Sequence, residues 1–177
     1  MKYVALLRGI NVGGNNKVPM AELRETVSRV GGEDVRTYIN SGNVIFEHDV
    51  SSAVEVASLV EDAIAADFGL EIRVLVLEAT EVRRIAETIP ETWSSGKEMR
   101  TDVIFLWDDL DSPGLVDDLP IRDGIDEVVY VPGAILWRID SEHLTKTWKG
   151  KLVGTPPYKS MTIRNVNTVR KLADLTR

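Results

Sequence analysis

The richest run of candidate ligand-binding residues lies near the start of the chain, in the loop Gly9–Lys17 (GINVGGNNK). Glycine lets a backbone approach a ligand closely, and asparagine supplies both hydrogen-bond donors and acceptors. Arg8 precedes this loop and Lys17 ends it, so a cation stands at each side. The combination suits a small anion. The loop is not a P-loop, because Asn15 and Asn16 stand where a P-loop has Lys followed by Ser or Thr.

Two other polar clusters complete the set of candidates. Asn40–Asn43 (NSGN) separates two short runs with β-branched and aromatic residues, so it also has a structural explanation as the turn of a hairpin. Thr162–Thr168 (TIRNVNT) contains Arg164, Asn165 and Asn167. These three side chains either belong to a ligand site or fix the last helix to the first half of the chain through hydrogen bonds.

The pattern from residue 2 to residue 77 predicts the elements that must position the loop and the turn. A buried strand over 2–8 precedes the loop, Pro19 opens a helix that Gly31 and Gly32 end, and strands over 35–39 and 44–47 flank the turn. A second helix runs from about residue 51 to residue 68, and a strand over 72–77 follows. This β-α-β-β-α-β order is that of a ferredoxin-like fold. Since its first two strands run parallel, with the third antiparallel between them, the loop and the turn are expected at one edge of the sheet.

The second half of the chain has a similar but less regular pattern. It predicts a helix over 80–89, a strand over 103–107, a short helix between 111 and 120, and a hairpin of strands over 128–131 and 134–139. Helical or irregular sequence follows over 144–152, and a last helix covers 163–175. No closing strand is evident. The predicted fold class is therefore α+β, with two ferredoxin-like halves (1–90 and 91–177) and a C-terminal helix.

Composition excludes several kinds of chemistry. The 177 residues include no cysteine and only two histidines, so thiolate metal sites, disulfides, a cysteine nucleophile and a multi-histidine metal site are ruled out. No metal site is predicted, and no cofactor is indicated. The first ten residues do not read as a signal peptide, because Arg8 interrupts the apolar run. We therefore expect a cytoplasmic protein that does not associate with a membrane.

Charge is distributed unevenly along the chain. The formal net charge is −7, yet the segment from residue 143 to residue 177 has eight basic residues and one acidic residue. This segment suggests a second hypothesis, a nucleic-acid-binding module that uses Lys146, Lys149, Lys151, Lys159 and Arg164. The simpler interpretation is that the basic segment packs on the acidic remainder of its own chain.

Two further features are interpreted as structural. Seven aspartates between residues 108 and 126 lack the spacing of a calcium-binding loop, so they predict a solvated segment rich in helix caps. His48 lies beside Asp49 at the end of a predicted strand. No nucleophile-elbow motif accompanies this pair, which favours a surface histidine over a catalytic one.

Four segments together resemble a bacterial family known as domain of unknown function 1697. They are LLRGINVGG (6–14), VPMAEL (18–23), TYINSGNVIF (37–46) and TIRNVNTVRKL (162–172). The family usually has tryptophan where this chain has Val166. The resemblance implies a two-part α+β fold with ferredoxin-like halves, and it supplies no activity, substrate or catalytic residue.

These observations lead to three hypotheses, and none of them commits the chain to being an enzyme, because no residue qualifies as a general base. The first is a polar cleft that binds a small anionic or phosphorylated ligand; the second is the nucleic-acid-binding module. The third is a protein-interaction domain whose polar motifs are structural. Neither the ligand's identity nor the oligomeric state can be read from the residues. The predicted ligand-binding residues are Arg8, Asn11, Gly13, Gly14, Asn15, Lys17, Asn40, Ser41, Asn43, Arg164, Asn165 and Asn167.

Overall fold

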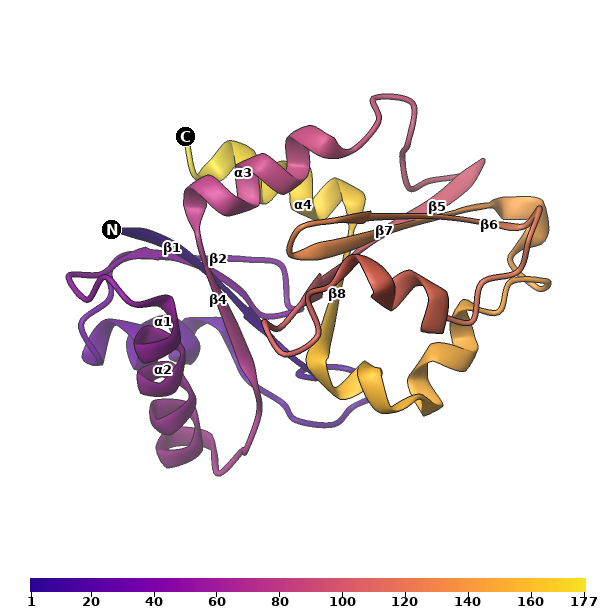
Figure 1. Cartoon of the computed structure of the whole chain (residues 1–177). Helices are drawn as coiled ribbons and strands as arrows, with labels where there is room; N and C mark the ends of the chain where they lie inside the picture. Colours follow the sequence, from indigo (N-terminus) through magenta and orange to yellow (C-terminus); the bar gives the residue numbers. More distant parts are fainter. The chain divides into compact units, whose positions relative to one another are not determined.

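Two four-stranded antiparallel sheets organise the chain in the computed structural model, which describes every residue from Met1 to Arg177 (Figure 1). The chain divides into two compact units. Unit 1 comprises Met1–Val82 together with Leu172–Arg177, and unit 2 comprises Arg83–Lys171. The division falls inside two helices, α3 (Ala79–Thr88) and α4 (Val166–Leu175), rather than in a loop between residues 90 and 91.

Unit 1 has the ferredoxin-like order that the sequence predicts. Its sheet has the strand order β2-β3-β1-β4, and every neighbouring pair is antiparallel. The elements in chain order are β1 (Lys2–Leu7), α1 (Met20–Arg29), β2 (Glu33–Tyr38), β3 (Asn43–Glu47), α2 (Ala53–Phe68) and β4 (Val74–Glu78).

Local sequence signals explain these elements. Alternate residues of β1 (Tyr3, Ala5 and Leu7) belong to a core cluster. The same cluster contains Leu23 and Val27 of α1 and Val56, Val60 and Ile64 of α2. The side chain of Ser52 caps α2 by accepting a hydrogen bond from the backbone N–H of Glu55, at 3.3 Å. Gly69 ends α2 in the left-handed conformation (φ 65°), which glycine adopts without strain because it has no Cβ.

Unit 2 repeats the arrangement, and the expectation of two ferredoxin-like halves is confirmed. Its sheet has the order β6-β7-β5-β8, the counterpart of β2-β3-β1-β4. The strands are β5 (Met99–Leu106), β6 (Asp126–Val131), β7 (Ala134–Asp140) and β8 (Met161–Asn165).

Strand β8 is the closing strand that the sequence analysis did not find. The predicted last helix over 163–175 was wrong at its start, because residues 163–165 pair with β5 and the helix begins at Val166. Ile163, Val166 and Val169 are spaced three residues apart, as on one face of a helix. Ile163, the last apolar residue of β8, therefore looked in the sequence like part of the helix. The side-chain oxygen of Asn165 accepts a hydrogen bond from the backbone N–H of Asn167 at 2.8 Å, which sets the helix start.

Short 3-10 segments take the place of the two helices that cover the sheet in unit 1. Segment η1 (Pro113–Asp118) follows β5, and η2 (Ser141–His143), η3 (Lys149–Gly154) and η4 (Pro156–Ser160) connect β7 to β8. In Figure 1 this connection includes the orange-to-yellow coils that lead into β8. Leu115 and Leu152 from these segments pack with the buried residues of the sheet. None of the chain's helices has the length and apolar composition needed to cross a bilayer.

Candidate functional site

The glycine-rich loop folds into a small finger, which we call the loop finger (Gly9–Lys17). At its tip the backbone N–H of Asn15 donates to the carbonyl of Val12 at 3.0 Å, and Gly13 and Gly14 both have positive φ (58° and 78°). Two positive φ values at the centre of a turn define the type I′ turn of tight hairpins. Added Cβ atoms at Gly13 and Gly14 would meet nothing within 4 Å, so the tip is open.

Asn11 joins the loop finger to the turn Ile39–Gly42. Its side-chain oxygen accepts from the N–H of Val18 at 2.8 Å, and its amide nitrogen donates to the carbonyls of Val18 (2.9 Å) and Asn40 (2.8 Å). The side chain of Asn16 donates to the carbonyl of Gly9 at 2.9 Å, which closes the base of the finger. The loop and the turn therefore lie side by side, as the ferredoxin-like order led us to expect.

The turn itself is tightly packed. The carbonyl of Gly42 accepts from the N–H of Leu7 at 2.9 Å. A Cβ on Gly42 would lie 2.7 Å from Cδ1 of Ile10 and 2.8 Å from Cβ of Leu7, so only glycine fits. Asn43 is fully buried, and its amide donates to the carbonyl of Tyr38 and to Oγ of Ser41. The amide of Asn11 thus holds the loop to the turn, and the amide of Asn43 stabilises the turn itself, whereas Asn40 and Asn15 are exposed.

A cation that the sequence analysis missed lies at the same edge of the sheet. The backbone N–H of Arg8 donates to the carbonyl of Arg73 at 3.0 Å, and this pair continues the register in which Leu7 faces Val74. Residues directly opposite in an antiparallel ladder present side chains on the same face. Arg73 could have been found from the sequence, because the antiparallel closing strand must begin where the first strand ends.

Charge at this edge is mainly positive. Arg8, Arg73 and the exposed Lys17 are all within or next to the base of the loop finger. The neighbouring acid is Glu61, whose carboxylate accepts from the N–H of Val74 at 2.6 Å. The edge can therefore attract an anion through its cations, its exposed amides and the exposed backbone at the tip of the loop finger.

The third predicted cluster lies in unit 2 and is internally bonded. Arg164 is buried, its Nη1 donates to Oγ1 of Thr162 (2.9 Å) and to the carbonyl of Ile163 (2.8 Å), and burial lowers the pKa of its guanidinium to about 10. The amides of Asn165 and Asn167 both donate to Ser95, at 2.7 and 2.8 Å. These bonds fix the start of α4 to the connection before β5, within the second unit itself.

Two interpretations from sequence need correction. His48, expected at the surface, is buried: its Nδ1 accepts from the N–H of Val50 at 3.0 Å, and its Nε2 lies 2.9 Å from the carbonyl of Val30. Asp126, placed in a solvated acidic stretch, is also buried. Burial is possible because four donors surround its carboxylate, one of them four residues away in the sequence and the others 11 to 22 residues away.

The carboxylate of Asp126 accepts four hydrogen bonds. Oδ1 accepts from Nε1 of Trp137 (3.1 Å) and from the hydroxyl of Thr147, and Oδ2 accepts from the N–H groups of Arg122 (2.9 Å) and Trp148 (3.4 Å). Burial by itself raises the pKa of Asp126, but these hydrogen bonds outweigh it and hold the pKa below its ordinary value. The group is an ionised structural link between β6, β7 and the 3-10 segments.

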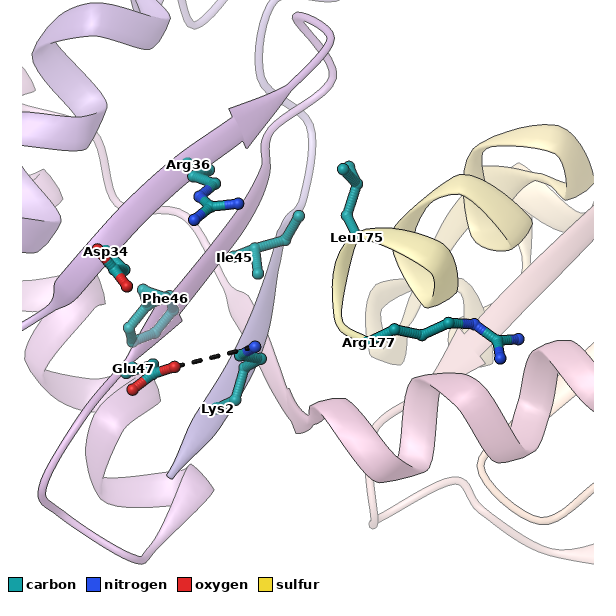
Figure 2. Close-up of a pocket in the computed structure, with 8 residues that line it drawn as sticks. All are labelled: Lys2, Asp34, Arg36, Ile45, Phe46, Glu47, Leu175 and Arg177. Atoms are coloured by element: carbon teal, nitrogen blue, oxygen red, sulfur yellow. Dashed lines mark ion pairs between the residues drawn. The ribbon is translucent and has the colours of Figure 1, made fainter.

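A small hollow in unit 1 lies on the sheet face away from α1 and α2. Figure 2 shows Leu175 and Arg177, at the end of α4, beside the strands that carry Ile45 and Lys2. The hollow measures about 130 Å³, and Lys2 forms an ion pair with Glu47 at 3.9 Å. Three basic and two acidic side chains line it, so their charges nearly cancel.

The basic segment does not present its five predicted cations as one patch. Arg164 is buried, and Lys149 forms an ion pair with Asp102. Lys151 places its ammonium 4.1 Å from the ring centre of Trp148, and the guanidinium of Arg122 lies 5.8 Å from the same ring. Lys146 and Lys159 are exposed.

Comparisons with known proteins agree with this architecture. A family model described as "Protein of unknown function (DUF1697)" matches residues 1–137. Among solved structures, the chain is similar to conserved bacterial protein SP0830 from Streptococcus pneumoniae, with 30% sequence identity, a TM-score of 0.83, and coverage of 99% of this chain and 98% of that chain. No curated protein matches the chain. Since the family model spans well over half of its residues, the chain belongs to the DUF1697 family of proteins of unknown function.

Proposed function

We propose that unit 1 binds a small anionic or phosphorylated ligand at the sheet edge formed by the loop finger and the turn Ile39–Gly42. The observation that carries the proposal is the hydrogen bond from Asn11 to the carbonyl of Asn40, because it fixes two polar segments beside each other. Arg8, Arg73 and Lys17 supply positive charge, and the tip glycines supply accessible backbone.

The geometry of the cation pair supports this proposal. Arg8 and Arg73 lie directly opposite each other in the ladder, so both side chains bring positive charge to the same face of this edge. A phosphate or carboxylate accepts hydrogen bonds from guanidinium groups in a paired, planar geometry. Asn40 and Ser41 provide the opposite wall, where hydroxyl and amide groups bind the neutral part of the ligand. Arg164, Asn165 and Asn167 are not needed for this arrangement.

Titration of the full-length protein with inorganic phosphate tests the proposal. Two-dimensional amide NMR should show saturable shifts at Gly9, Gly13 and Gly14, and the affinity should fall as ionic strength rises, because exposed charges are screened by salt. Lys17→Gln and Arg73→Gln should each weaken binding roughly three- to tenfold, since a tenfold loss corresponds to about 1.4 kcal/mol.

The matched control is Lys2→Gln, which removes a cation of the same unit at the other end of β1. Its phosphate affinity should equal that of the unaltered protein. Equal losses of phosphate affinity in Lys17→Gln and Lys2→Gln would show that only the net charge of the protein matters, and they would contradict the proposal. Amide shifts that do not saturate with phosphate would contradict it as well.

A further inference from the structure

The 3-10 segments of unit 2 leave a groove above one face of its sheet. The groove has a volume of about 310 Å³ and is bounded by the sheet on one side and by residues 144–158 on the other. Its lining residues are Arg100, Asp102, Ile139, Leu144, Thr147, Lys149, Gly150, Leu152, Val153, Tyr158 and Ile163. This volume is at the lower end of the range of about 300–1,000 Å³ for small-molecule sites.

The groove follows from the way unit 2 covers its sheet. In unit 1 the corresponding face is covered by helices of 10 and 16 residues, whereas η3 and η4 have 6 and 5 residues. The shorter segments bring fewer apolar side chains to the sheet. As a result Ile163 is only partly buried, and Leu144 and Val153 remain 38% and 62% exposed at the rim.

Charged groups gather on one strand beside this apolar surface. Arg100 and Asp102 are two residues apart on β5 and therefore lie on the same face as Ile139, which is directly opposite Arg100. The Asp102 carboxylate forms an ion pair with Lys149, and both side chains are largely covered (25% and 17% exposed). The guanidinium of Arg100 has no ion-pair partner, so the groove holds two cations and one anion.

We infer that this groove binds a small amphipathic carboxylic acid, with its apolar body against Ile139, Ile163 and Val153 and its carboxylate at Arg100. The carboxylate supplies the missing counter-charge, and the fixed fork of arginine suits it. The apolar body covers rim side chains that otherwise face water. This site is separate from the anion-binding edge proposed for unit 1.

The probe for this site is 3-phenylpropanoate, compared with the neutral amide 3-phenylpropanamide, each titrated into the full-length protein by amide NMR. The acid should shift the amides of Gly150 and Val153 in a saturable manner and bind at least fivefold more tightly than the amide. Arg100→Gln should abolish this preference and leave the affinity for the amide unchanged. Lys97→Gln, which removes an exposed cation outside the groove, should retain it.

In a second variant, the affinity for the acid should change in the opposite direction. Asp102→Asn removes the carboxylate that engages Lys149, so the acid should bind roughly five- to tenfold more tightly, a gain of about 1–1.4 kcal/mol. An unchanged or weaker affinity in folded Asp102→Asn would contradict the assigned charge balance. Absence of saturable shifts at Gly150 and Val153, or an acid preference that survives Arg100→Gln, would overturn the site. Phosphate shifts at Gly13 and Gly14 report on unit 1 separately, so either proposal can fail alone.

Discussion

Replacement of Asp126 by asparagine tests whether the buried carboxylate holds unit 2 together. Asparagine keeps one acceptor oxygen and replaces the other with an N–H₂ group. If the remaining oxygen faces Arg122 and Trp148, the hydroxyl of Thr147 can rotate to accept from the new amide. The indole N–H of Trp137 cannot rotate in this way, and its ring is fully buried. The variant therefore leaves at least one buried donor facing another donor.

The cost follows from the hydrogen bonds that change. A hydrogen bond to a charged group contributes about 1.5–3 kcal/mol, and an unsatisfied buried donor costs about 1–3 kcal/mol. We expect Asp126→Asn to lose roughly 3–4 kcal/mol of unfolding free energy, which lowers Tm by about 6–15 °C for a chain of this size.

Tryptophan fluorescence is a selective assay for this effect. All four tryptophans lie in unit 2, at Trp93, Trp107, Trp137 and Trp148. The matched control is Asp123→Asn, an exposed acid three residues away, which should change the unfolding free energy by less than about 0.5 kcal/mol.

Acid adds a second readout. Because the folded-state pKa of Asp126 lies below the ordinary value of 3.8, the unfolded chain takes up the proton first as pH falls. The stabilisation is therefore complete above the ordinary value and is lost as pH falls through the folded-state pKa. The Tm difference between the two proteins should be constant from pH 5 to pH 8 and shrink below about pH 4. A difference below 1 kcal/mol, or equal effects in Asp126→Asn and Asp123→Asn, would refute the reasoning.

Three further predictions concern unit 1 and are read out by amide hydrogen exchange in β1. Asn11→Ala should destabilise the unit by about 2 kcal/mol, because three hydrogen bonds are lost, whereas Asn15→Ala should be nearly neutral. Similar effects of the two substitutions would contradict the role of Asn11 in holding the loop finger to the turn. Gly42→Ala should lower the unfolding free energy by about 2–3 kcal/mol, because the alanine has an unfavourable positive φ and its Cβ overlaps with Ile10 and Leu7. Gly14→Ala should lower it by only about 1 kcal/mol, through the positive φ alone. Equal losses would show that the steric overlap at position 42 has no effect. Ile39→Asn should stabilise the unit by about 1 kcal/mol, since a φ of 51° is unfavourable for a β-branched residue, while Val12→Asn should change its stability little. A loss of stability in Ile39→Asn would show that the backbone at this position is not strained.

The parts of the structure that the sequence predicted are those with strong local signals. Helix α2 was predictable because Ser52 caps it, Gly69 ends it, and Val56, Val60 and Ile64 repeat at helical spacing. Strand β8 was not predictable, because its last apolar residue, Ile163, matches the spacing of the apolar residues in the helix that follows. Arg8 and Arg73 are 65 positions apart in the chain, so no local motif links them, and only the predicted order of the strands points to their pairing.

Burial of polar groups was the least predictable feature. Asp126 stands among exposed aspartates and has no distinctive neighbour in the sequence, so its role depends on Trp137 and Thr147, which only the folded sheet brings near. The loop and turn were placed correctly beside each other. Some of their asparagine side chains make structural hydrogen bonds and others are exposed, however, and residue type alone does not tell which asparagine does which.

The division of the chain inside α3 and α4 has a consequence for how the protein is made. Unit 1 contains both the first residues and the last six, so unit 2 is in effect an insertion within it. During synthesis the ribosome releases Leu172–Arg177 only after every residue of unit 2 has been made. Leu175 and Arg177 then arrive beside Ile45 and Lys2, which were synthesised first (Figure 2). The synthesis of unit 1 therefore begins before that of unit 2 and is completed after it.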